Sequence, residues 1–191
     1  MPAVDQEAVD LFKLKAGPVS ITVTERRRLS EAMVYALNLH RPEEAHGLLA
    51  APGWPPEFMA ELIHAAGPAG FKVVAEGLRD YPAGFDLAFT TADLAIASTA
   101  TCVLSCPGED LRLATMLGQT HVLALPKARV VREAYQAEDF LRAALDQEAM
   151  YAAFISGPSR TADIERVLTL GVHGPLAMHV VLLDEDPGER F

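Results

Sequence analysis

Residues 154–184 read FISGPSRTADIERVLTLGVHGPLAMHVVLLD, and this stretch indicates how the whole chain folds. It starts as a short apolar strand and passes through a tight Ser-Gly-Pro-Ser-Arg loop. The apolar residues between 164 and 168 are spaced to share one helical face, which predicts a helix that ends before Gly171. Residues 178–183 predict a second strand that closes on Asp184. The stretch is therefore typical of one αβ unit in a layered sheet protein.

Strands alternate with helices along the rest of the chain as well. Strands are predicted at 19–24, 47–51, 71–75, 87–89, 102–106 and 121–125, and helices at 4–15, 25–39, 57–66, 109–117 and 137–150. This alternation predicts an α/β fold with a mainly parallel sheet covered on both faces. The length of 191 residues suits a single domain, 1–191, in which residues 1–15 are a candidate N-terminal helical appendage.

The charge balance argues against some classes of function. The chain has 16 basic residues against 26 acidic ones, for a formal net charge of −10. General nucleic-acid or anionic-membrane binding needs basic patches, so we expect neither, while a local cationic pocket for a small anion is compatible with this balance. The first residues lack the pattern of a signal peptide, and no apolar run reaches the ~18–20 residues of a membrane span. We therefore expect a cytoplasmic protein.

The candidate metal ligands in the sequence are two cysteines and one stretch that contains histidines. Cys102 and Cys106 fall in a predicted strand, where residues four apart lie about 13 Å from each other, too far for a disulfide or a shared metal ion. We expect two buried thiols. The stretch HRPEEAH at 40–46 favours a solvated loop, because Pro42 has polar neighbours. No four-cysteine spacing for an iron–sulfur cluster is present, so the prediction is no metal and no cofactor held by this chain.

Ligands of an open parallel sheet bind beyond the carboxyl ends of its strands, and this rule sorts the polar residues. The loops at 90–93, before 109 and at 156–161 fall on that side. The candidate ligand-binding residues are Thr91, Asp93, Thr99, Thr101, Arg112, Ser156, Ser159 and Arg160. The two arginines would hold a carboxylate or phosphate, and the hydroxyls would orient it.

Most of these candidates also have a purely structural interpretation. Ser159 or Thr161 could cap the predicted helix, and Asp93 is either an N-cap of a helix-like piece or an acid that faces the ligand. His121 begins a core strand, where packing or hydrogen bonding is favoured. His173 falls at the opposite edge of the sheet, which favours a structural or interface role.

Short catalytic motifs are absent, but one longer pattern is present. Residues 156–173, SGPSRTADIERVLTLGVH, followed by Gly174-Pro175 and a strand, resemble the C-terminal motif of the LUD-domain family, whose type member is lactate utilization protein C. Further pieces appear in the order and spacing of that family, namely 91–93, 95–97, 99–104, Arg112-Leu113 and His121-Val122. The resemblance covers about half of the chain, 86–184, and is specific because it is long.

The resemblance implies a fold and a role. The fold would be an α/β three-layer sandwich similar to the sugar-phosphate isomerase and coenzyme A transferase superfamily. The role would be accessory, in the oxidation of L-lactate to pyruvate together with iron–sulfur partner proteins that supply the redox centres. One departure concerns the ligand: the family usually has Thr-Gly-Thr where this chain has Thr99-Ala100-Thr101, and a methyl group would hinder close backbone approach. Another is Leu176, where an arginine is common.

The leading hypothesis is therefore a lactate-utilization accessory protein in which the eight candidate residues converge on a pocket for a small anionic metabolite. A first alternative is a stand-alone enzyme of the isomerase or acyl-transfer type, with Asp93 as the catalytic acid or base. A second is a non-catalytic interaction module that presents residues 171–175 to a partner.

Overall fold

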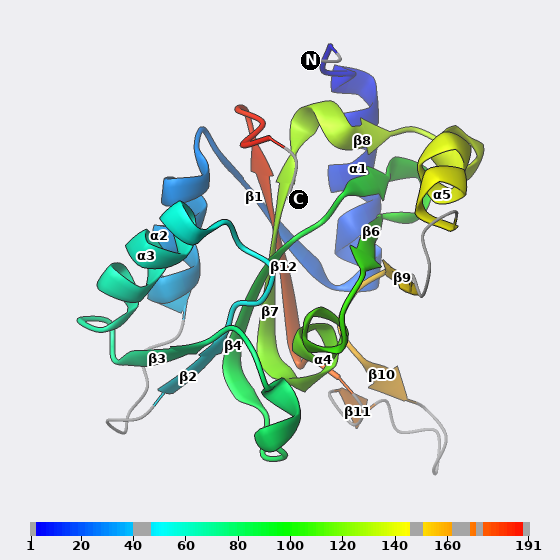
Figure 1. Cartoon of the computed structure of the whole chain (residues 1–191). Coiled ribbons are helices and arrows are strands. Elements are labelled where there is room, and N and C mark those ends of the chain that lie inside the picture. The colour runs from blue at the N-terminus through cyan, green and yellow to red at the C-terminus, as the bar shows by residue number, and fades with distance from the viewer. Residues whose placement is uncertain (1–2, 40–46, 146–150, 162–168, 171–173, 189–191) are drawn as a thin grey trace.

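A six-stranded sheet, parallel throughout, forms the centre of the computed structural model, which describes residues 3–39, 47–145, 151–161, 169–170 and 174–188 (Figure 1). Its strands, in spatial order, are β3 (Phe71–Val74), β2 (Gly47–Ala50), β4 (Phe85–Thr91), β7 (Gly118–Pro126), β12 (Ala177–Leu183) and β1 (Ile21–Arg26). The predicted α/β fold with a mainly parallel sheet is confirmed. All carboxyl ends of these strands consequently meet at one edge.

The central strands are apolar because both of their faces are buried. In β12 the four residues from Val180 to Leu183 are fully buried, and β7 places Leu123 beside Val180. Alternate side chains of a strand point to opposite faces, so each such run fills the core on both sides of the sheet.

Two helices cover one face of the sheet. These are α2 (Leu29–Leu39) and α3 (Pro56–Ala66), whose inner side chains pack with Leu49, Phe89 and Val181. The helix predicted at 25–39 begins four residues later, because β1 continues to Arg26 and Thr24 is part of that strand.

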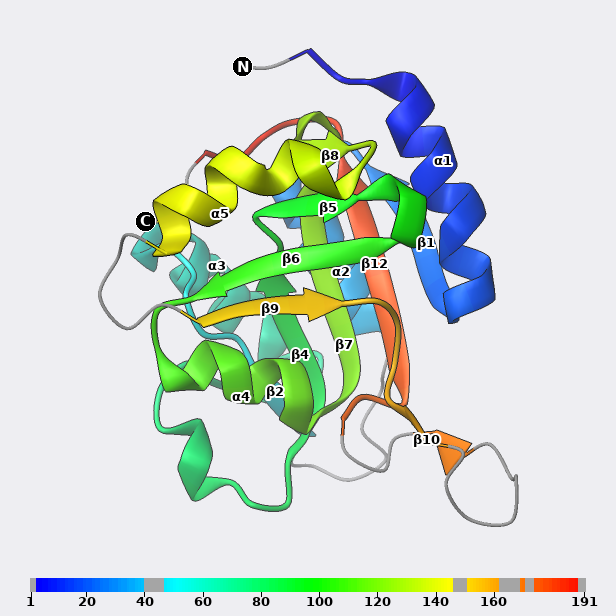
Figure 2. The same cartoon turned by 90° about the vertical axis from the view of Figure 1, so that its right-hand side faces the viewer.

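A second, four-stranded sheet covers the other face, in the order β8 (Val130–Val131), β5 (Leu94–Ile96), β6 (Thr101–Cys106) and β9 (Tyr151–Ile155) (Figure 2). Here β6 is antiparallel to both β5 and β9. This second sheet was not predicted, and the piece after Asp93, expected to be helix-like, begins with strand β5. The outer face of the sheet packs against α5 (Glu138–Leu145).

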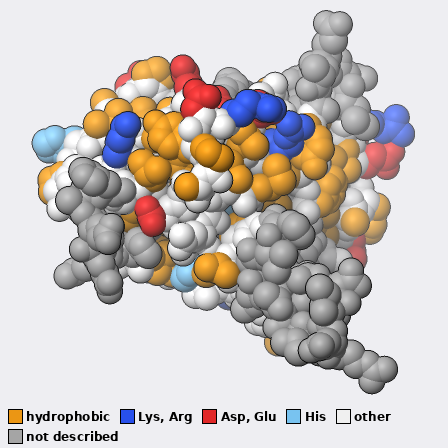
Figure 3. Space-filling view, turned by 90° about the horizontal axis from the view of Figure 1, so that it is seen from below, with side chains coloured by type: hydrophobic (Ala, Val, Ile, Leu, Met, Phe, Trp, Pro, Cys, Tyr) orange, Lys and Arg blue, Asp and Glu red, His pale blue; other side chains and the backbone are white. Residues whose placement is uncertain are grey.

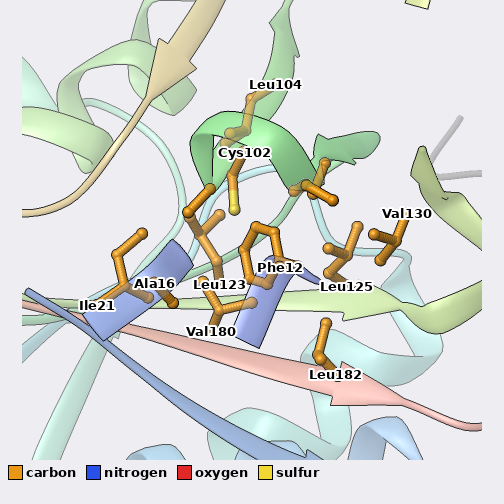
Figure 4. Close-up of a cluster of buried hydrophobic side chains, with 14 of the residues drawn as sticks. Phe12, Ala16, Ile21, Cys102, Leu104, Leu123, Leu125, Val130, Val180 and Leu182 are labelled. Atoms are coloured by element: carbon orange, nitrogen blue, oxygen red, sulfur yellow. The ribbon is translucent and has the colours of Figure 1, made fainter. Parts of the chain in front are cut away.

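Side chains of the N-terminal helix, α1 (Gln6–Ala16), pack in the space between the two sheets. Phe12 lies among Cys102 of β6 and Leu123 and Leu125 of β7, as Figure 4 shows. The helix α4 (Glu109–Leu117) packs nearby against β4 and β7. The segment predicted as a candidate appendage thus contributes buried side chains to the core between the sheets.

The remaining elements are short. The 3-10 helices are η1 (Gly17–Val19), η2 (Leu78–Asp80), η3 (Ala97–Thr99), η4 (Lys127–Arg129) and η5 (Ala134–Ala137). A two-stranded ladder pairs β10 (Arg160–Thr161) with β11 (Thr169–Leu170), so both ends of the helix predicted in this region are strands. The middle of that predicted helix, 162–168, lies outside the described residues, as does the stretch 40–46.

Two details of the second sheet correct or confirm earlier expectations. Ala100 has a left-handed backbone, with φ of 49°, and its side chain is fully buried in the core between the sheets. The glycine common in the family suits this backbone conformation, a reason different from close approach of a ligand. Cys102 and Cys106 are free and buried as predicted, and burial raises the pKa of the Cys102 thiol to about 12.

Candidate functional site

A cavity of about 160 Å³ opens at the carboxyl edge of the parallel sheet. Its walls come from the ends of β4, β7 and β12, from the start of α2 and α3, and from the segment after β12. The lining residues are Leu29, Trp54, Pro55, Glu57, Phe58, Thr91, Ala92, Ala124, Pro126, Arg129, Leu183, Pro187 and Gly188. Most of this lining is apolar, and Arg129, Glu57 and Thr91 supply its polar side chains.

Trp54 is the largest side chain of the wall, and its position is fixed. Its indole N–H donates to the carbonyl of Phe89 over 2.8 Å, and its ring stacks on the Phe89 ring at 4.8 Å between centroids. The Phe58 ring lies 4.6 Å from the Trp54 ring on the cavity side of α3. The aromatic wall is therefore held in place before any ligand arrives.

Arg129 is the cationic group of the cavity. Its Nε donates to Asp186 Oδ2 over 2.9 Å and its Nη2 to Asp186 Oδ1 over 2.6 Å. Nη2 also donates to the carbonyl of Gly188 over 2.6 Å. The side chains of Arg129 and Asp186 are 22% and 12% exposed. This is a bidentate, partly buried pair, the geometry in which a guanidinium recognises a carboxylate.

A second ionic group lies at the carboxyl ends of β1, β7 and β12, outside the cavity lining. Lys127 Nζ pairs with Asp184 at 2.6 Å and with Glu25 at 2.5 Å, and Lys13 also pairs with Glu25. Hydrogen bonds from Lys127 and Lys13 lower the pKa of Glu25. Burial acts to lower the pKa of Lys127, but its bonds to Asp184 and Glu25 outweigh burial and raise it. Both shifts favour the charged forms of Glu25 and Lys127.

The eight candidate residues occupy several separate places. Thr91, at the end of β4, lines the cavity. Asp93 lies between β4 and β5, and its Oδ2 accepts from the backbone N–H and the hydroxyl of Ser105, over 2.5 and 2.8 Å. Asp93 is not part of the cavity lining.

Three other candidates form a row of hydroxyl groups. Thr101 Oγ1 lies 2.7 Å from Thr99 Oγ1 and 2.7 Å from Ser156 Oγ. Thr101 is buried, whereas Thr99 and Ser156 are exposed. The row stands where β6 begins and β9 ends, so the antiparallel pairing of these strands brings the three residues together.

Arg112 and the Ser159–Arg160 pair lie elsewhere. The Arg112 guanidinium is 3.3 Å from Glu109 and 5.5 Å from the centre of the Tyr151 ring, at the opposite end of β9 from Ser156. Four residues of strand separate these ends, roughly 14 Å. The Ser159 N–H donates to the carbonyl of Pro175 over 3.0 Å. Arg160 is in β10, but its side chain lies outside the description. Among the described side chains, the eight do not share one cavity.

Two histidines were assigned structural roles from the sequence. His121 is fully buried, and its Nε2 lies 2.9 Å from the hydroxyl of buried Thr90, which confirms the expectation that it packs and bonds in the core. Burial lowers its pKa to about 4, so its ring is neutral at neutral pH. His173 lies outside the described residues.

Sequence analysis missed the main residues of the cavity. Trp54 follows β2, Arg129 follows β7 and Asp186 follows β12, so the rule of strand carboxyl ends points to all three. The predicted loops were those at 90–93, before 109 and at 156–161, and of these the first supplies Thr91 to the cavity, whereas the other two follow β6 and β9 of the second sheet. Within the described residues, no group of three or more His, Cys, Asp or Glu side chains could hold a metal ion. No helix there is long and apolar enough to cross a membrane.

The fold and cavity define a layered α/β protein with a ligand-sized space at the carboxyl edge of a parallel sheet. The chain belongs to the LUD domain family, which it matches over residues 15–183. A crystal structure of a DUF162 family protein from Deinococcus radiodurans has the same fold, with a TM-score of 0.65 and 14% identity, covering 95% of this chain and 99% of that one.

Curated relatives carry the name lactate utilization protein C. The Exiguobacterium sp. protein is 37% identical over 115 residues, which are 58% of this chain and 49% of the relative. The Geobacillus thermodenitrificans protein is 34% identical over 97 residues, 49% of this chain and 40% of the relative. A protein of Bacillus mycoides named lactate utilization protein C 1 is 32% identical over 103 residues, 52% and 44% of the two chains. The matches therefore span about half of this chain and less than half of each relative.

Proposed function

We propose that this protein is an accessory component of L-lactate oxidation to pyruvate, working in the cytoplasm with iron–sulfur partner proteins that carry the redox centres. The relatives named lactate utilization protein C support the pathway. Under this proposal the chain itself binds a small anionic metabolite and holds no cofactor.

The cavity at the carboxyl edge is the place proposed for that metabolite. One observation carries this: Arg129 lines a space large enough for a small organic acid and presents its guanidinium in carboxylate-binding geometry. Thr91 adds a hydroxyl on the wall that the sequence also selected. Opposite charge and bidentate hydrogen bonding would bind the acid, and the aromatic wall would exclude water.

Isothermal titration of the purified chain with lactate, pyruvate and phosphorylated metabolites tests the pocket. We expect at least one of these anions to bind, and Arg129→Gln to weaken its binding tenfold or more because the bidentate contact is lost. Arg142→Gln is the matched control, since Arg142 is exposed and pairs with Glu138 on α5. Absence of heat for every anion would contradict the pocket. Arg160→Ala in the same titration tests whether the loop residues predicted from the sequence take part.

The interaction module remains a second candidate, and exposed apolar side chains favour it. Leu176 directly precedes β12 and Met116 lies in the last turn of α4, both near the amino end of the sheet, and their side chains are 51% and 43% exposed. Figure 3 shows the molecule from that end, with hydrophobic side chains spread over its described surface. The segment 171–175 proposed as a partner contact adjoins Leu176.

Co-purification with the iron–sulfur partners distinguishes this candidate from the pocket. Leu176→Glu should reduce capture of those partners at least tenfold, because a carboxylate in an apolar contact is desolvated without a counter-charge. Leu14→Glu, on the exposed side of α1, is the control and should leave capture unchanged. Equal capture by both variants would argue against a contact at this end. The alternative of a stand-alone enzyme predicts turnover without partners that Asp93→Asn abolishes.

A further inference from the structure

The segment after the last strand forms part of the cavity wall and carries the carboxylate that pairs with Arg129. Residues 184–188, here the closing segment, follow β12 and place Pro187 and Gly188 in the cavity wall. Within this segment the Gly188 N–H donates to Asp186 Oδ1 over 3.0 Å. This hydrogen bond orients the Asp186 carboxylate toward Arg129.

The Arg129–Asp186 pair reproduces the contact that a bound acid would make. Both carboxylate oxygens are engaged, one by Nε and one by Nη2. Among the carboxylates of the described residues, Asp186 is the one paired with Arg129. A partly buried guanidinium needs such a partner, because an uncompensated charge in this position is costly. Asp186 therefore satisfies Arg129 when no other carboxylate is present.

The closing segment is held firmly at its start and weakly beyond it. The backbone N–H groups of Asp184 and Glu185 donate to the carbonyls of Arg26 and Arg27 over 3.0 Å. Glu185 pairs with Arg27 and Arg28 at 3.1 and 3.4 Å, and all three side chains are about half exposed or more. Asp184 pairs with Lys127, but its own side chain is 55% exposed. Exposed ion pairs of this kind contribute little to stability, so residues 186–188 are held mainly through Arg129. Exchanging the Asp186 carboxylate for another one would conserve the strongest contact of the site.

The size and the side chains of the cavity limit the size, polarity and charge of a ligand that fits it. A dry cavity of about 150 Å³ accommodates benzene, so about 160 Å³ suits an acid of about ten non-hydrogen atoms or fewer. Trp54, Phe58 and Leu29 offer apolar surface to such an acid. Glu57, on the same wall, would repel a second negative charge on the ligand.

We infer that the cavity binds a small monocarboxylate with an apolar body, and that the carboxylate of the ligand replaces Asp186 on Arg129. This inference rests on the pocket of the proposed function and deepens it. Asp186 acts as a resident competitor: it pairs with Arg129 in the empty site and lowers the apparent affinity for the acid. Residues 186–188 move away from Arg129 when the ligand binds, while the backbone hydrogen bonds of Asp184 and Glu185 keep the start of the closing segment in place.

Binding of benzoate and benzamide to the full chain tests this. Benzoate fits the cavity, and benzamide has the same shape without the charge. We expect benzoate to bind, benzamide to bind at least tenfold more weakly, and Asp186→Asn to tighten benzoate binding about tenfold because the competing carboxylate is gone. Asp184→Asn is the matched control: it removes a carboxylate of the same segment that pairs with Lys127 and not with Arg129, so benzoate affinity should stay within twofold.

The possible outcomes separate this inference from the proposed function. Benzoate binding that Asp186→Asn leaves unchanged or weakens would overturn the exchange of carboxylates. No binding of benzoate to either the natural chain or Asp186→Asn would overturn the apolar monocarboxylate site. Lactate or pyruvate binding that depends on Arg129 but not on Asp186 would retain the proposed function while overturning the inference. A thermal-shift measurement without ligand accompanies each variant, so a loss of folding is recognised as such.

Discussion

Replacing Phe12 by alanine is expected to destabilise the protein by about 4 kcal/mol, from the usual range for truncating a buried aromatic side chain. Phe12 is fully buried between α1 and the facing surfaces of both sheets, where it contacts residues of β6 and β7. Its removal leaves a cavity that surrounding strands cannot close without losing their own hydrogen bonds. Urea unfolding followed by circular dichroism measures the change in the free energy of unfolding.

The matched control for this substitution is on the same helix. Leu14 is 71% exposed, so Leu14→Ala should change the free energy of unfolding by less than about 0.5 kcal/mol. A Phe12→Ala variant as stable as Leu14→Ala would show that α1 is dispensable for the core. In that case residues 1–15 would be the appendage that the sequence allowed. Loss of more than about 2 kcal/mol makes α1 part of the folded unit.

Acid should weaken the fold through His121. This residue is fully buried, and in the described part of the chain its Nδ1 has no hydrogen-bond partner. Burial lowers its pKa to about 4 from the ordinary value near 6.5. A proton on Nδ1 would place an unpaired donor and a positive charge in the core between the parallel sheet and the second sheet.

The sign of the effect follows from where the proton binds. Above about pH 6.5 the ring is neutral in both states, and His121 adds no pH dependence. As the pH falls from about 6.5 to about 4, the His121 imidazole binds a proton in the unfolded chain but stays neutral in the folded chain. The free energy of unfolding therefore decreases over this range. A pKa difference of this size corresponds to about 3 kcal/mol below pH 4.

Urea unfolding at pH 7.5, 6, 5 and 4 measures this loss for the natural chain and for His121→Gln. The glutamine does not titrate, so its free energy of unfolding should fall by about 3 kcal/mol less over this range, whatever its stability at pH 7.5. His64→Gln is the control, because His64 is exposed on α3. Parallel curves for the natural chain and His121→Gln would contradict the assignment.

Most helices and strands, and the parallel arrangement of the central sheet, could be predicted from the sequence. Helix α4 was predicted at its observed bounds, and the strands at 47, 71, 121 and 178 were placed within a few residues. These predictions succeed because hydrophobic periodicity, β-branched runs and breaker residues are local properties. The burial of His121 and both cysteines followed from the same local pattern.

Site prediction was less complete, because it needed to know which sheet each strand joins. The hydroxyl row of Thr99, Thr101 and Ser156 was selected from the sequence, but as part of a parallel edge instead of an antiparallel pair. Arg112 was selected with them and lies at the other end of β9. A strand looks the same in sequence whether it joins one sheet or the other.

The sequence by itself thus determined an α/β chain with a parallel core sheet and family membership, since both are recorded in local pattern and residue order. Only the tertiary structure decided that β5, β6 and β9 leave that sheet, and that Trp54, Arg129 and Asp186 meet at its edge. The physical reason is that strand pairing joins segments far apart in the chain. Its outcome depends on the packing of all layers together, and no single stretch of sequence contains that information.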